Sequence, residues 1–237
     1  MAVHPAIARL LAAIESRDVR AIAGALTPQA TWQNVPHAAV VGRDAVLGLL
    51  APIVTWSQAV RWDVVSAAEA DDTGWVERVD RFWIDDVEYA VRCHGVFTCT
   101  GDRVAAVRDY VDLGVWRAQI GPVLERLRAR PADVVVARHL AAVRAGDAVA
   151  MAADYALDAE LVRGADVYRG WRAIGDYFAG VPARLAGRRV VFAEPVVATD
   201  GTVSVRWLIG STGGVDRYTV VAGRIAHQTV ELEGPDF

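Results

Sequence analysis

Two acidic segments stand out because each places a carboxylate where a strand pattern predicts an inward-facing apolar residue. They read Glu77-Arg78-Val79-Asp80 and Arg108-Asp109-Tyr110-Val111-Asp112. Side chains at every second position of a strand share one face. Arg78 and Asp80 therefore share a face, and Asp109 is the charged member of the row Ala105, Val107, Asp109, Val111, Leu113. Two carboxylates and a guanidinium that meet in a buried place can share the cost of burial, and they have the parts of an acid–base catalyst.

Such a cluster would divide its protons unequally. Two carboxylates in one site do not both stay ionised cheaply, so one is expected to act as a base and the other as an acid near neutral pH. A guanidinium between them stays charged and can donate to both. One strand, at 87–99, fits between Asp80 and Asp109, so their strands are predicted to be second neighbours in a meander. The alternative without chemistry is a buried salt-bridge cluster.

The elements that must position these residues follow from the hydrophobic periodicity. In the first half, Ile7, Leu10, Leu11 and Ile14 recur at helical spacing after Pro5 and predict a first helix. A second short helix is expected from Asp18 as N-cap through Leu26, a strand at 31–35 and a third helix near 43–52. Alternation then predicts strands at 61–69, 74–84, 87–99 and 103–113, separated by turn residues. Helices followed by an antiparallel meander are typical of an α+β fold, with the helices covering one face of a curved sheet.

The second half repeats this plan. Its patterns predict helices at 131–145, 147–155 and 172–179, and strands at 157–163, 188–198, 202–210, 215–221 and 224–232. An internal repeat of about 110–130 residues is the simplest account. We expect domains at 1–125 and 131–237. Aligning the halves by their turns replaces each polar residue of interest by an apolar one: Val205 at Arg78, Trp207 at Asp80, Val230 at Asp109 and Val162 at Asn34.

Composition narrows the class of protein. The chain has 237 residues, 54% of them hydrophobic, and a net charge of −4 without a basic run, so nucleic acid is an unexpected partner. Cys93 and Cys99 share a strand face and are read as core residues rather than metal ligands. No signal peptide or membrane-spanning run is visible, so we expect a cytoplasmic protein without a membrane partner.

The first half, over roughly residues 4–115, resembles the limonene-1,2-epoxide hydrolase family, within the NTF2-like and SnoaL-like superfamily. The matching segments are the two acidic segments together with Trp32-Gln33-Asn34-Val35-Pro36, Gly42-Arg43 and Gly95-Val96-Phe97. The second half resembles only the generic NTF2-like fold. The resemblance implies two tandem cone-shaped NTF2-like domains, of which the second lacks the catalytic triad.

The resemblance also implies a reaction. Water would be added to a hydrophobic small-molecule epoxide in one step to give a vicinal diol, with no metal and no organic cofactor. Asp109 matches the general base, Asp80 the general acid, and Arg78 the residue that orients both. Asn34 matches a ligand of the nucleophilic water. Trp32 stands where the family has a Tyr that also binds this water, and an indole can donate a hydrogen bond but cannot accept one.

Other functions stay open at this point. An epoxide-opening cyclase would use a hydroxyl of the substrate in place of water. A ketosteroid-isomerase-like or SnoaL-like enzyme of secondary metabolism would leave Arg78 unexplained, and a non-catalytic small-molecule-binding protein would merely retain the triad. The second domain is expected to pair with the first as an intrachain pseudo-dimer, and a homodimer is also compatible with the sequence. Of the tryptophans at 56, 62, 75, 83 and 116, we expect most to lie in the core or at the helix–sheet interface.

Overall fold

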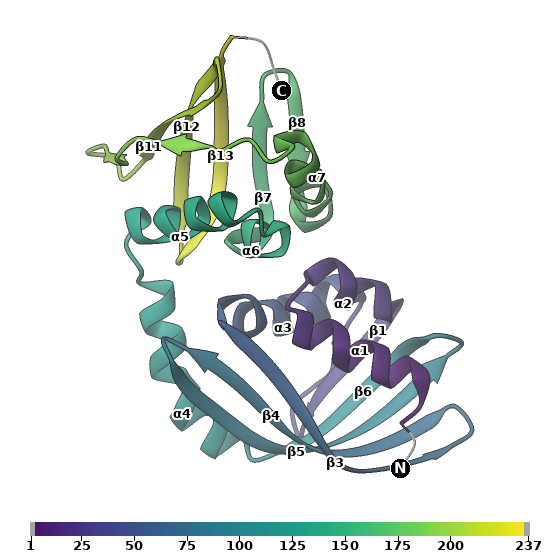
Figure 1. Cartoon of the computed structure of the whole chain (residues 1–237). Coiled ribbons are helices and arrows are strands. Elements are labelled where there is room, and N and C mark those ends of the chain that lie inside the picture. Colours follow the sequence, from purple (N-terminus) through teal and green to yellow (C-terminus); the bar gives the residue numbers. More distant parts are fainter. Residues whose placement is uncertain (1–2, 235–237) are drawn as a thin grey trace. The chain divides into compact units, whose positions relative to one another are not determined.

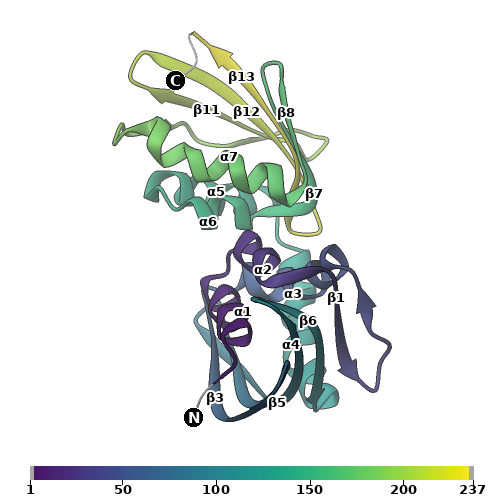
Figure 2. The same cartoon turned by 90° about the vertical axis from the view of Figure 1, so that its right-hand side faces the viewer.

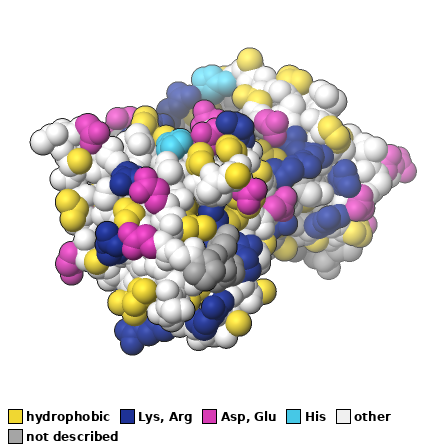
Figure 3. Space-filling model, turned by 90° about the horizontal axis from the view of Figure 1, so that it is seen from above, with side chains coloured by type: hydrophobic (Ala, Val, Ile, Leu, Met, Phe, Trp, Pro, Cys, Tyr) yellow, Lys and Arg dark blue, Asp and Glu magenta, His cyan; other side chains and the backbone are white. Residues whose placement is uncertain are grey.

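The computed structural model describes residues 3–234, and the chain divides into two compact units, Met1–Leu124 and Glu125–Phe237. Each unit combines a mixed, mainly antiparallel sheet with helices (Figure 1). The expected α+β class is therefore confirmed. None of the described helices is long and apolar enough to cross a membrane. Side chains of both charges intermingle on the face shown in Figure 3.

Unit 1 begins with helices and continues as a meander. Its elements are α1 (Pro5–Ser16), α2 (Val19–Ala25), β1 (Leu26–Val35), β2 (Val40–Val41), α3 (Arg43–Trp56), β3 (Ala59–Ala70), β4 (Thr73–Ile84), β5 (Val87–Thr100) and β6 (Arg103–Val111). The sheet order is β2-β1-β6-β5-β4-β3, with β1 and β6 parallel and the other neighbours antiparallel.

The helices of unit 1 cover the concave face of its sheet (Figure 2). Helix α1 buries Ile7, Leu10 and Ile14 against that face, and it contacts β3 and β6. Asp18 caps α2 through a hydrogen bond from the Arg20 N–H, which satisfies a backbone donor that the first turn leaves unpaired. The layer of helices closes one side of the space into which the inward rows of β4 and β6 point.

Helix α4 (Leu113–Arg128) was not expected from the sequence, which predicted a strand up to 113 and no helix before 131. The division between the units falls inside this helix, after Leu124. Gly114, Gly121 and Pro122 are poor helix formers, and they hid the helix from pattern reading.

Unit 2 repeats the order of unit 1. It contains α5 (Ala132–Ala145), α6 (Ala148–Ala153), β7 (Tyr155–Arg163), β8 (Asp166–Arg169), α7 (Gly170–Leu185), β9 (Val191–Phe192), β10 (Val196–Val197), β11 (Val203–Ile209), β12 (Thr212–Val221) and β13 (Arg224–Glu233). The strands follow the order β10-β11-β12-β13-β7-β8, and β9 pairs with β11. Helices α5 and α7 lie along one face of this sheet (Figure 2).

The expected strand at 188–198 is wrong. Only β9 and β10 form there, two residues each, and they are largely exposed. Pro195 separates them, and because proline lacks the backbone N–H it interrupts a ladder of hydrogen bonds.

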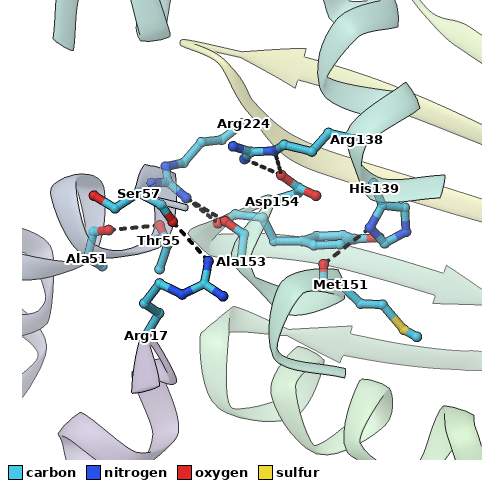
Figure 4. Close-up of polar contacts among 11 residues, drawn as sticks. Arg17, Ala51, Thr55, Ser57, Arg138, His139, Met151, Ala153, Asp154 and Arg224 are labelled. Carbon is cyan, nitrogen blue, oxygen red and sulfur yellow. Dashed lines mark hydrogen bonds and ion pairs between the residues drawn. The ribbon is translucent and has the colours of Figure 1, made fainter. Parts of the chain in front are cut away.

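Polar contacts hold buried groups of both units in place (Figure 4). In unit 2, the Arg138 guanidinium pairs with the buried Asp154 carboxylate. His139 is buried, and its Nδ1 lies 3.2 Å from the Met151 carbonyl oxygen, which makes Nδ1 the protonated nitrogen. In unit 1, Arg17 donates to the carbonyl of Ser57 at 2.9 Å.

Candidate active site

The sheet of unit 1 brings the two acidic segments together as second neighbours. Strand β5 lies between β4 and β6, as the sequence predicts, and Arg78 pairs with Cys93 while Asp109 pairs with Gly95. Strand alternation turns Arg78, Asp80 and Asp109 inward, where they are 0%, 6% and 4% exposed. The predicted inward faces of both strands are therefore confirmed.

A single guanidinium bridges the two carboxylates. Arg78 Nε donates to Asp80 Oδ1 at 2.7 Å, and Arg78 Nη2 donates to Asp109 Oδ2 at 2.9 Å. The guanidinium carbon also lies 4.3 Å from the ring centroid of Trp62 and 5.6 Å from that of Phe97. Charge-assisted hydrogen bonds and the two aromatic faces together fix the position of Arg78.

Gly95 gives Arg78 the room to cross the middle strand. A Cβ at this position would lie 2.4 Å from Arg78 Nη1 and 2.8 Å from Asp109 Oδ1. Both distances are shorter than real Cβ contacts, so any side chain on β5 here would displace the bridge. A glycine inside a strand often marks such a close approach, and this was the available sequence signal for its role.

Electrostatics separate the two carboxyl groups. Burial raises the pKa of Asp80 to about 7, because it outweighs the attraction of Arg78, and the nearby Asp109 charge acts in the same direction as burial. Burial alone would lower the pKa of Arg78, but Asp109 and Asp80 together raise it, so the guanidinium stays charged. With Asp80 protonated, the buried cluster carries no net charge.

A cavity of about 120 Å³ opens onto the cluster. Its wall includes Asp80 and Asp109, together with Asn34, Trp32, Trp62 and Trp116, and its other lining residues are mainly aliphatic and aromatic. Asn34 lies on β1 and pairs in register with Asp109. All five residues singled out from the sequence thus lie at one place: four line the cavity, and Arg78 lies behind its wall.

Two tryptophans that the sequence did not assign to the site, Trp62 and Trp116, line the cavity. The rings of Trp32 and Trp62 meet edge to face, with centroids 6.3 Å apart. Trp62 pairs in register with Asp80 across β3 and β4, which places it beside the cluster. Because the Arg78 guanidinium lies over its ring and Trp32 packs against it, Trp62 is a fixed wall of the cavity.

Three buried polar atoms at this place have no hydrogen-bond partner among the described residues: Trp62 Nε1, Arg78 Nη1 and Asp109 Oδ1. An unsatisfied buried polar group is costly, so each is a candidate for contact with water or a ligand. The cluster thus retains two donors and an acceptor. Among residues 3–234, no three His, Cys, Asp or Glu side chains gather in a way that could hold a metal ion.

Strand pairing corrects the alignment of the two halves. When Val230 is matched to Asp109, the partner of Val230 on β7 is Arg163, so Arg163 and not Val162 takes the place of Asn34. On β12, Asp216 takes the place of Gly95. On β11, Trp207 falls at Arg78 and Ile209 at Asp80, two residues from the expected register. The row on β11 is apolar as predicted, but unit 2 has buried polar residues of its own at Arg163 and Asp216.

Comparison with known proteins finds a family match in the first unit. Residues 7–107 match the family model described as the SnoaL-like domain. No curated protein sequence matches the chain.

Similar solved structures each correspond to about half of the chain. One is a protein with a ketosteroid isomerase-like fold from Catenulispora acidiphila, in complex with trimethylamine (20% identity, TM-score 0.44, covering 51% of this chain and 95% of that one). Another is an LEH-like epoxide hydrolase from M. tuberculosis (21% identity, TM-score 0.40, covering 50% and 92%). TerC, crystallised with polyporic acid, is a third (16% identity, TM-score 0.42, covering 50% and 99%). The chain is thus an α+β protein of two units, and most of the first unit, residues 7–107, matches the SnoaL-like domain model.

Proposed function

We propose that unit 1 is a cofactor-independent epoxide hydrolase that adds water to a hydrophobic epoxide. The observation that carries this proposal is one buried guanidinium bonded to two carboxylates, one of which has its pKa raised to about 7, at the wall of a mostly apolar cavity. Opening an epoxide needs a base for the attacking water and an acid for the departing oxygen, and this cluster offers both.

Each residue has a defined part in the reaction. Asp109 accepts a proton from water as the water oxygen bonds to an epoxide carbon. The carbon–oxygen bond on that side breaks, and Asp80 donates its proton to the released oxygen. A proton then passes from Asp109 to Asp80 to restore the starting state. Arg78 keeps both carboxyl groups in place, and Asn34, beside Asp109 in the sheet, holds the water.

Trp62 adds a donor to this scheme. Trp62 lines the cavity, and its indole N–H is buried without a hydrogen-bond partner among the described residues. A buried donor that lacks a partner in the free protein can donate to an oxygen of a bound substrate. Trp62 is thus suited to orient the epoxide oxygen or the water.

The test is hydrolysis of a panel of styrene-oxide-type and terpene epoxides in ¹⁸O-labelled water. One labelled oxygen per diol is expected. Asp80→Asn and Asp109→Asn should abolish diol formation while the protein stays folded. Asp112→Asn is the matched control, because Asp112 is exposed and an amide oxygen can still accept the Val115 N–H. Ligand binding without turnover on any epoxide would overturn the proposal.

A second candidate is an epoxide-opening cyclase. It is favoured by Trp32, which is 2% exposed and packs edge to face with Trp62, so it forms a wall where the hydrolase family has a water-binding Tyr. Epoxides that carry a hydroxyl group on the same chain distinguish the two reactions. A cyclic ether without label would assign the cyclase, and a labelled triol would assign the hydrolase.

A further inference from the structure

The cavity of unit 1 has a closed inner end and a more open mouth. Most of its buried lining residues stand on the sheet, beside the carboxylates: Trp32, Trp62, Phe82, Val91 and Cys93. Most of its partly exposed lining residues come from α3 and from the first turn of α4: Leu49, Ile53, Leu113 and Trp116. These two helices therefore border the mouth.

Two pairs of aromatic rings narrow the space next to Asp80. Trp62 lies beside Asp80 across the pair of strands β3 and β4, and its ring meets that of Trp32 edge to face. Phe82 follows Asp80 on the same face of β4, and the ring of Trp116 packs against it with centroids 5.4 Å apart. The general acid of the proposed reaction thus has an aromatic wall on two sides.

The volume of the cavity limits which epoxide can place its three-membered ring at the carboxylates. The cavity measures about 120 Å³, whereas an apolar cavity that encloses one benzene ring measures about 150 Å³. In an epoxide fused to a six-membered ring, both epoxide carbons belong to that ring, so the whole carbocycle must enter with them. A terminal epoxide carries a single substituent, which can extend through the mouth.

The lining also specifies the character of this substituent. Of the residues that line the cavity, all in the described part of the chain, Asp80 and Asp109 are the two with ionisable carboxyl groups, and none is basic. The residues of α3 and α4 at the mouth offer aliphatic side chains and the Trp116 ring. A charged or strongly polar substituent would be desolvated there without a partner, so a hydrocarbon chain fits best.

We propose that the substrate of unit 1 is a terminal epoxide on an unbranched hydrocarbon chain, and that Leu49 and Trp116 set this preference at the mouth. This inference rests on the proposed hydrolase function and names its substrate class. The unsubstituted epoxide carbon lies at the inner end with Asp80 and Asp109, and the chain leaves the cavity past α3 and α4. Ring-fused epoxides are excluded because the two aromatic pairs leave too little room for a carbocycle.

Turnover of two six-carbon epoxides by the full-length protein tests the preference. We expect kcat/KM for 1,2-epoxyhexane to exceed that for cyclohexene oxide at least about tenfold. Trp116→Ala and Leu49→Ala each widen the mouth, so each should raise kcat/KM for cyclohexene oxide and reduce the ratio. Leu49 is 38% exposed, so its replacement tests the mouth even if Trp116→Ala unfolds. The matched control is Trp75→Ala, on the opposite face of β4 and outside the cavity, which should leave the ratio unchanged.

Binding of the two corresponding diols separates this inference from the hydrolase proposal. Tryptophan fluorescence reports binding, because Trp32, Trp62 and Trp116 line the cavity. Hexane-1,2-diol should bind at least about tenfold more tightly than cyclohexane-1,2-diol. An equal or higher kcat/KM for cyclohexene oxide would overturn the substrate class and leave the hydrolase standing. If neither epoxide reacts, a retained diol preference would overturn the hydrolase proposal alone, whereas equal or absent diol binding would overturn both.

Discussion

Gly95→Ala is the sharpest test of the geometry in unit 1. The new Cβ would lie 2.4 Å from Arg78 Nη1, and this atom must retreat by 1.0 Å to reach the 3.4 Å at which ordinary contact begins. Hydrogen bonds of 2.7 and 2.9 Å hold the same guanidinium to Asp80 and Asp109, so it can retreat only by breaking them. Overpacking of this kind costs about 1–3 kcal/mol of unfolding free energy. A misplacement of about 1 Å in a catalytic group lowers the rate on the order of a hundredfold.

Two measurements check this prediction. Urea unfolding of the Gly95→Ala variant gives the loss of stability, and epoxide turnover gives the loss of kcat/KM. The matched control is Gly48→Ala in α3, whose Cβ would meet nothing within 4 Å and should stabilise the helix by up to about 1 kcal/mol. A Gly95→Ala protein as stable as the parent would refute the position of Arg78. Lost stability with full turnover would instead refute the dependence of the chemistry on the bridge.

Four further predictions concern the charges and donors of the two units. Because Asp80 must be protonated to act as the acid and burial raises its pKa to about 7, kcat/KM should fall about tenfold per pH unit above that value in a profile from pH 6 to 9. The same raised pKa means that the native state holds a proton which the unfolded chain loses near pH 4. The free energy of unfolding of unit 1 should therefore fall by on the order of 4 kcal/mol as the pH rises from 4 to 7. Urea titrations of the Asp80→Asn variant should not show this fall. The Trp62→Phe variant keeps a ring against Arg78 but removes the unpartnered N–H. Its melting temperature should therefore be unchanged or higher, while kcat/KM drops about tenfold. An unchanged kcat/KM would rule out the donor role. Burial lowers the pKa of His139 to about 4, so the free energy of unfolding of unit 2 should fall by about 3 kcal/mol as the pH falls from 6.5 toward 4. A His139→Phe variant should not show this acid sensitivity in the same urea titrations.

Strand alternation was enough to predict the inward faces of the first unit. Arg78 and Asp80 share a face because they are two residues apart, and the length of the intervening segment was enough to predict that β4 and β6 are second neighbours. The role of Gly95 was not predictable in this way, since it depends on which residues of three strands stand side by side. The lining role of Trp62 depends on the register between β3 and β4, which no local pattern encodes.

The buried polar residues of unit 2 around Asp216 were missed for a related reason. Aligning the halves by their turns tested only the positions of the first cluster, and those are apolar on β11. Asp216 and Tyr218 have the same parity on β12, which is the one local hint of a buried polar row. Gln228 and Arg163 join them only through the pairing of β13 with β12 and β7.

Strands β5 and β12 occupy equivalent places in the two sheets, and each allows a different arrangement of buried charge. Where β5 has Gly95, neighbouring strands send their charges across it; where β12 has Asp216, the middle strand supplies the charge itself and closes that path. Grafting an arginine and two aspartates onto unit 2 would therefore fail unless Asp216 were first replaced by glycine. After a duplication, one substitution of glycine by aspartate at this position would be enough to prevent one copy from forming the charge arrangement of the other. Each copy could then acquire its own ligand.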